Sequence, residues 1–185
     1  MQRYTLIAIV LHWLVAVVAI VAASLPWLWP HLADESVRPV INLHKSLGIT
    51  ILGLALMRIL WRISHAPPPL PDSYARHEQL LAKWVHRLLY GLILVLPISG
   101  WVMDSAYRDA ALFPMPFFGL FEWPRLGPIL TMDPSVRESI HSNFGALHVY
   151  MSWALYVLVA LHIVGALKHQ VIDGNPALRR MLPGA

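Results

Sequence analysis

Residues 148–162, HVYMSWALYVLVALH, form an apolar stretch with a histidine at each end. His148 and His162 are 14 residues apart, which is about 21 Å along an α-helix. Fourteen steps of roughly 100° return to within about 40° of the start, so both rings are expected on one helix face. Ionisable groups inside a membrane are costly and by default functional. The spacing therefore suits two metal centres stacked within a membrane about 30 Å thick.

The composition of the chain indicates an integral membrane protein. Of its 185 residues, 57% are hydrophobic and 13% are charged, against about 25% charged in soluble domains. The apolar runs predict an all-α fold, a single domain over 1–185 with four transmembrane helices at about 6–25, 44–63, 84–103 and 146–167. The first run is interpreted as a retained helix because it is long for a signal peptide and lacks a small-residue cleavage site.

The residue types available as metal ligands are restricted. The absence of cysteine excludes disulfides, thiolate iron–sulfur clusters and covalent c-type haem attachment. Any metal or haem must be held by histidine, methionine, tyrosine or carboxylate, and the chain has ten histidines and seven methionines. The net charge of +4 is unevenly distributed, so it argues for membrane orientation and not for nucleic-acid binding.

Positive charge predicts that both termini are cytoplasmic. Nine lysines and arginines fall on the side of the N-terminus (Arg3, Arg58, Arg62, Arg76, Lys83, Arg87, Lys168, Arg179, Arg180) and five on the other (Arg38, Lys45, Arg108, Arg125, Arg137). The proline-rich connection 64–83 is then a stiff cytoplasmic loop. The irregular, aromatic connection 104–145 is expected to lie along the periplasmic interface as a lid.

Placed at these depths, four histidines form two pairs. His12 matches His162 nearer the cytoplasmic side, and His44 matches His148 nearer the periplasmic side. Each pair uses two helices, as two bis-imidazole b haems in the bundle core require. A lone interfacial histidine is the ordinary alternative, but it explains four paired histidines poorly. His141 could replace His148, although its distance from His162 of about 32 Å along a helix is too long for both to lie in the hydrocarbon.

Further residues have two interpretations each. His86 and His169, near cytoplasmic helix ends, could bind a quinone and pass protons, or could face lipid headgroups. Arg58 and Arg62 share a helix face and could pair inner-haem propionates, or could be positive-inside anchors. Lys45, beside His44, could pair the propionates of the outer haem or attract an anionic reductant.

Glycines near the histidines allow either a macrocycle or a neighbouring helix to approach the backbone closely. Gly48 follows His44 by four residues, and Gly165 follows His162 by three.

In combination, these motifs resemble the prokaryotic cytochrome b561 family over nearly the whole chain. The residues that carry the resemblance are Leu11-His12-Trp13, 42–48 (NLHKSLG), Arg58 and Arg62, 86–90 (HRLLY) through 97–100 (PISG), His148, Leu161-His162-Ile163, 166–169 (ALKH) and the tail 173–181 (DGNPALRRM). Each piece is weak alone, and their order and spacing together are specific.

The resemblance implies a bacterial cytoplasmic-membrane cytochrome with two b haems that carries electrons between the periplasmic face and the quinone pool. One branch of the family oxidises superoxide and reduces ubiquinone. The resemblance supports His12, His44, His148 and His162 as haem ligands, and His86 and His169 match family positions. The expected partners are the lipid bilayer, a quinone, and superoxide or another periplasmic donor.

Two other functions compete with this electron conduit. Relatives of the same architecture serve as cytochrome b membrane-anchor subunits of hydrogenases and dehydrogenases, which predicts a co-purifying large redox subunit. A histidine-lined transporter or metal channel predicts a colourless purified protein.

Overall fold

The fold is all-α and is dominated by four long helices. The computed structural model describes residues 3–71, 73–175 and 177–182. The long helices are α1 (Leu6–Leu28), α2 (Asp34–Ser64), α3 (Arg76–Ser105) and α5 (Pro134–Leu167). All four are long and apolar enough to cross a membrane, which confirms the four-helix membrane bundle predicted from the sequence.

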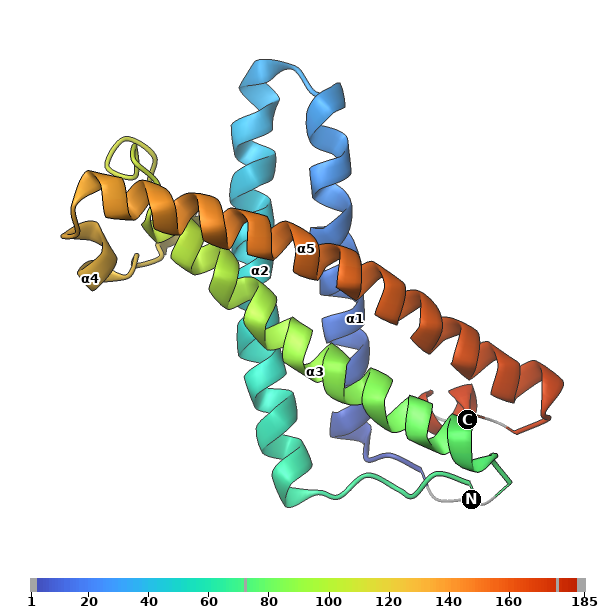
Figure 1. Ribbon diagram of the computed structural model, residues 1–185. Coiled ribbons are helices and arrows are strands. Elements are labelled where there is room, and N and C mark those ends of the chain that lie inside the picture. The colour runs from blue at the N-terminus through green and yellow to red at the C-terminus, as the bar shows by residue number, and fades with distance from the viewer. Residues whose placement is uncertain (1–2, 72, 176, 183–185) are drawn as a thin grey trace.

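The helices form two hairpins that cross (Figure 1). α1 packs against α2, α3 packs against α5, and α2 against α3 joins the two hairpins. Four passes return the chain to the end of the bundle where it began. There the indole Nε1 of Trp13 donates to the carbonyl oxygen of Met181 (2.6 Å), and the guanidinium of Arg180 lies over the ring of Tyr4. We call this the terminus end, and the opposite end the lid end.

Three helices are longer than the sequence predicted. α2, α3 and α5 begin at Asp34, Arg76 and Pro134, whereas the expected ranges began at 44, 84 and 146. Hydropathy detects only the apolar part of a helix, and polar first turns extend each one. In α5 the Asp133 side chain accepts a hydrogen bond from the amide of Ser135 (2.9 Å), and Pro134 follows it at the first helical position.

The lid, residues 106–133, connects α3 to α5 and is shorter than the expected 104–145 segment. It contains an antiparallel hairpin of β1 (Pro116–Phe117) and β2 (Phe121–Glu122) and a short helix α4 (Gly127–Leu130). Gly119 in the hairpin turn has φ +74°, a conformation that glycine adopts without steric penalty. The lid docks on α2, where the amide of Phe118 donates to Ser46 Oγ (3.0 Å).

The C-terminal segment continues α5 through a π-helical turn, η2 (Lys168–Ile172), and a 3-10 helix, η3 (Leu178–Met181). A corresponding 3-10 turn, η1 (Trp29–His31), joins α1 to α2 at the lid end.

Candidate functional site

Two histidine pairs lie between the hairpins. The ring centroids of His12 on α1 and His162 on α5 are 6.1 Å apart. Those of His44 on α2 and His148 on α5 are 6.2 Å apart. The structure therefore brings together both pairs that the sequence predicted by depth, each joining one helix of the first hairpin to α5.

The spacing of each pair fits one metal ion between two imidazoles. A metal bonded to one nitrogen of each ring at about 2 Å places the ring centroids roughly 6 Å apart. Within the described residues, the only group of three close histidine, cysteine or acidic ligands lies elsewhere, at Glu78, His169 and Asp173. Each pair thus supplies only two protein ligands. This donor set suits a haem iron, whose other ligands come from the macrocycle.

At the lid end, the second nitrogen of each imidazole is held by protein oxygens. His44 Nδ1 donates to the carbonyl oxygen of Ala22 (2.8 Å). His148 Nδ1 lies 3.1 Å from the carbonyl oxygen of Leu96 and 2.9 Å from Ser99 Oγ. Bonds of this kind orient the ring, fix its tautomer and leave Nε2 free as a metal ligand.

The sequence PISG at 97–100 positions His148. A Cβ at Gly100 would lie 3.3 Å from His148 Cε1, so a larger residue would push the imidazole away by a few tenths of an ångström. Ser99 Oγ donates to the Leu96 carbonyl oxygen (2.7 Å) and keeps a lone pair for His148 Nδ1–H. Sequence reasoning missed the role of Ser99. The available signal was a serine–glycine pair after a proline inside an apolar helix.

Buried polar atoms beside both pairs lack partners among the described residues. They are His12 Nδ1 and the indole Nε1 of Trp29, whose ring packs edge-on against His44 with centroids 6.0 Å apart. An unpaired buried donor or acceptor destabilises the fold by about 1–3 kcal/mol, so each calls for an explanation. A polar cofactor held between the histidines would supply one.

The two candidate macrocycle-approach glycines are not explained by helix packing. A Cβ at Gly48 or at Gly165 would meet no atom within 4 Å, so no neighbouring helix requires glycine there. Gly53 and Gly91 have the same open surroundings.

Arginines gather beside the pair at the terminus end. The guanidinium groups of Arg58 and Arg62 lie over the ring of Tyr90, at 5.0 and 5.2 Å from its centroid. Arg58 is close enough to His12 and His162 to interact with both electrostatically. Both arginines therefore stay candidates for pairing the carboxylates of a haem.

His86 joins the pair at the terminus end. Its ring centroid is 5.1 Å from that of His162, at an interplanar angle of 77°. Among the histidines that the pairing by depth leaves unused, His86 is the one whose ring packs against His162. A small molecule bound beside it would lie next to His162.

His169 lies in a different environment from His86. It is buried and stacks on Tyr74 with ring centroids 3.7 Å apart, and its Nδ1 donates to Asp173 Oδ2 (2.6 Å). Lys168 bridges Asp173 (2.9 Å) and Glu78. The hydrogen bond from Lys168, followed by that from His169, lowers the pKa of Asp173, and burial raises the pKa of Tyr74. These residues attach the end of α5 to the 73–78 segment.

Lys45 is held in an ion pair. Its Nζ contacts Asp104, and the Lys45 and Asp104 side chains are 15% and 8% exposed. Arg125 of the lid binds the other oxygen of Asp104 at 3.0 Å. Two cations and one carboxylate leave this cluster with a net charge of +1, directly beside His44.

His141 belongs to neither histidine pair. The structure includes it in α5, where its Nδ1 donates to the carbonyl oxygen of Met103 (2.9 Å).

A four-helix membrane protein with two imidazole pairs in its core has the architecture of a membrane b-type cytochrome. The family model for prokaryotic cytochrome b561 matches residues 3–184, and the chain belongs to this family.

Three relatives cover nearly the whole chain. Cytochrome b561 homolog 2 of Escherichia coli K12 is 34% identical, over 98% of this chain and 92% of its own length. A probable superoxide oxidase, CybB, of Yersinia pestis is 27% identical, over 98% and 97%. Cytochrome b561 homolog 1 of E. coli K12 is 25% identical, over 99% and 98%. The chain is thus a membrane cytochrome related to an oxidoreductase.

Proposed function

We propose that this chain is a single-domain, di-haem electron conduit of the bacterial cytoplasmic membrane. The observation that carries the proposal is the pair of centroid distances, 6.1 Å for His12–His162 and 6.2 Å for His44–His148. His12 and His162 would hold one b haem, and His44 and His148 the other. Bound haems would supply one-electron redox chemistry at two depths of the membrane, and the protein sets their potentials by ligation, burial and charge.

We further propose superoxide as the electron donor at the lid end. The support is the relative described as a probable superoxide oxidase, together with the net positive charge of the Lys45–Asp104–Arg125 cluster. A local cation raises the encounter rate of a small anion, and salt screens the effect. Because Lys45 is paired with Asp104, steering belongs to the cluster and not to Lys45 alone.

The proposed acceptor at the terminus end is ubiquinone. His86 is the candidate to hydrogen-bond a quinone carbonyl, because it packs against His162. His169 is the candidate for proton delivery, since its hydrogen bond to Asp173 faces the polar end of the bundle. Two superoxide ions would be oxidised to two dioxygen molecules, and one ubiquinone with two protons would become ubiquinol.

The proposed orientation places both termini and the quinone in contact with the cytoplasmic side, and the lid in the periplasm. It rests on the nine-to-five distribution of lysine and arginine.

Stopped-flow mixing of the oxidised protein with superoxide, with and without ubiquinone, tests the proposed reaction. The expected result is haem reduction faster than in a b-type control protein, with turnover only when quinone is present. Lys45→Glu should weaken the salt dependence of the rate. Reduction no faster than the control would reject superoxide as donor and favour a membrane-anchor subunit, which a co-purifying redox partner would then identify.

A further inference from the structure

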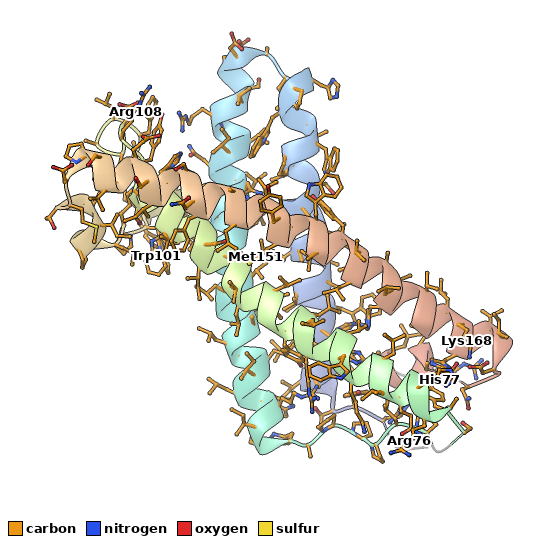
Figure 2. All side chains as sticks on the ribbon, viewed as in Figure 1. Arg76, His77, Trp101, Arg108, Met151 and Lys168 are labelled. Carbon is orange, nitrogen blue, oxygen red and sulfur yellow. The ribbon has the colours of Figure 1, made fainter. Side chains whose placement is uncertain are left out.

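The lid and Arg137 of α5 line a half-open cavity apart from the histidine pairs. It has a volume of about 610 Å³. Three arginines, Arg108, Arg125 and Arg137, contribute to its wall together with the indole of Trp123. Figure 2 shows Arg108 of the lid at one end of the molecule and Lys168 at the other. The histidine pairs and the proposed quinone site use none of these four residues, whereas Arg125 also belongs to the Lys45–Asp104–Arg125 cluster.

The three arginines differ in how far the protein satisfies them. The guanidinium of Arg125 is satisfied by protein acceptors, since it donates to Asp104 and to the carbonyl oxygens of Ala110 and Phe113. Arg108 forms an exposed pair with Asp109 at 3.3 Å. Arg137 donates from Nη2 to the carbonyl oxygen of Tyr107 (2.6 Å). Across the part of the chain that the structure describes, no acidic side chain pairs with Arg137.

Two N–H donors in the cavity wall have no acceptor. Arg137 Nε and Trp123 Nε1 are both buried from solvent, and neither has a hydrogen-bond partner within the described residues. A buried charged donor without an acceptor is among the costliest polar groups in a fold. Because protein atoms cover both donors, an anionic oxygen group bound in the cavity would accept from them only after the two side chains turn toward it, and it would then neutralise the charge of Arg137.

The remaining wall is mostly apolar. Met115 is buried, and Leu130 is 41% exposed. The one acidic side chain of the wall, Glu122, belongs to an exposed residue. The ligand that matches this lining has an anionic head for the arginine and the indole, and an apolar portion for Met115 and Leu130.

The depth of the cavity agrees with a lipid headgroup. Arg137 precedes His148 by 11 residues on α5, or about 16 Å along the helix axis toward the lid end. If His148 lies within the hydrocarbon, Arg137 lies nearer the membrane surface on the lid side. The planar fork of a guanidinium matches the oxygens of a phosphate.

We propose that this cavity binds a phosphate group, with Arg137 and Trp123 as its donors. The inference goes beyond the proposed electron transfer and does not depend on it. Two sources carry the same chemistry, the headgroup of an anionic phospholipid and free phosphate, and the apolar wall matches the lipid.

The experiment uses the full-length, haem-loaded protein in detergent after removal of co-purified lipid. Native mass spectrometry measures binding of phosphatidylglycerol and of diacylglycerol with identical acyl chains, so that the two probes differ only in the phosphate headgroup. Inorganic phosphate is titrated alone and as a competitor. The variants are Arg137→Gln, Trp123→Phe and the control Arg38→Gln, which removes a cation from the same end but outside the cavity wall.

The expected result is one saturable phosphatidylglycerol per chain, bound at least about ten-fold more tightly than diacylglycerol. Arg137→Gln should weaken binding roughly ten-fold and Trp123→Phe about three- to five-fold, whereas Arg38→Gln should have no effect. Saturable binding of inorganic phosphate that Arg137→Gln abolishes would support the site with a soluble ligand.

Three results would overturn the proposal. The first is equal binding of the two lipids without binding of inorganic phosphate. The second is an equal effect of Arg137→Gln and Arg38→Gln on lipid affinity. The third is an affinity that neither Trp123→Phe nor Arg137→Gln changes. Water would then be the acceptor in the cavity. If Arg137→Gln fails to fold, Trp123→Phe decides alone, because it keeps an aromatic side chain at this position and removes the N–H donor.

Discussion

Gly100 lies directly against the imidazole of His148, and a Cβ at this position would come within 3.3 Å of His148 Cε1. The backbone of α3 therefore forms one wall of the slot that holds the ring. The same stretch supplies the Leu96 carbonyl and the Ser99 hydroxyl to His148 Nδ1. The orientation of His148 therefore depends on α3, which carries neither His148 nor its partner His44.

Substitution of Gly100 or Ser99 tests this positioning role. Gly100→Ala should displace the His148 ring, and Ser99→Ala should remove one acceptor from its Nδ1–H. Loss of a hydrogen bond behind a metal ligand lowers metal affinity roughly ten- to one-hundred-fold. We expect both variants to lose haem from the lid-end pair, and Ser99→Ala also to raise the potential of the haem it retains, because its ligand becomes less basic.

Haem content and redox titration measure these effects. Gly91→Ala is the matched control, since a Cβ there would meet no atom within 4 Å. Identical haem content in Gly91→Ala and Gly100→Ala would contradict the positioning role.

Removal of one ligand should empty one site. His162→Ala is expected to reduce the haem content from about two to about one per chain and to leave the spectrum of the lid-end haem in place. A pyridine haemochrome assay gives the stoichiometry. Some loss of stability is expected, because a ligand that binds only the folded state stabilises it. His77→Ala, at an exposed position near the start of α3, is the control, and a wild-type ratio near one would refute the two-haem proposal.

The ion pair of Lys45 predicts a structural effect as well as a kinetic one. Lys45→Met should lower the melting temperature, because Asp104 is 8% exposed and loses one of its two cations. Arg125 still neutralises Asp104, so the loss should be about 1–3 kcal/mol, below that of breaking an isolated buried pair. In an Asp104→Asn background, Lys45→Met should lower the melting temperature less than it does in the wild type, because the pair is already broken and Lys45 then faces only Arg125. An equal loss in both backgrounds would argue against the pair.

The contact between Asp173 and Lys168 predicts a pH-dependent stability. The pKa of Asp173 lies below its ordinary value of 3.8, chiefly because Lys168 donates to it and then because His169 does. A lowered pKa in the folded state stabilises the fold above pH 3.8, and the contribution is lost as pH falls through the lowered value. Asp173→Asn should therefore melt at a lower temperature than the wild type at pH 7, and the difference should close toward pH 3.

Thermal melts across this range measure the difference. Glu78, Tyr74 and Arg180 also act on this cluster, and the same series in Glu78→Gln separates the contribution of Glu78. Asp109→Asn is the control, because its pair with Arg108 is exposed and contributes little. A difference that stays constant with pH would contradict the assignment.

Membrane orientation is tested at the C-terminus. A reporter that is active only in the periplasm should be inactive when fused after Ala185, and active when inserted in the lid after Leu120, whose side chain is 77% exposed. The opposite pattern would reverse every assignment of side and exchange the proposed donor and acceptor faces.

The height of each histidine could be predicted from the sequence, because helix rise and the apolar runs determine it. The pairs His12–His162 and His44–His148 follow from that height alone, and the structure brings both together; their ligand role stays a prediction. The partner of Lys45 could not be predicted, since Asp104 is distant in the chain and meets it only when α2 packs on α3. His169 was grouped with His86 by sequence position, whereas the π-helical turn after α5 directs it to Tyr74. The helical extensions before residues 44, 84 and 146 were not predicted, because they are polar and hydropathy does not detect them.

Both histidine pairs join the first hairpin to the last helix, and this has a consequence for biogenesis. His12 and His162 are separated by 150 positions, and His44 and His148 by 104. While a ribosome is still translating the third helix, the nascent chain contains one half of each site and neither complete pair. If each pair holds one haem, as proposed, neither haem gains its second ligand until α5 has entered the bilayer, and contacts between segments so distant in the chain form slowly. During that interval His12 and His44 lie in the membrane without their partners, and the half-built bundle presents polar imidazoles to lipid.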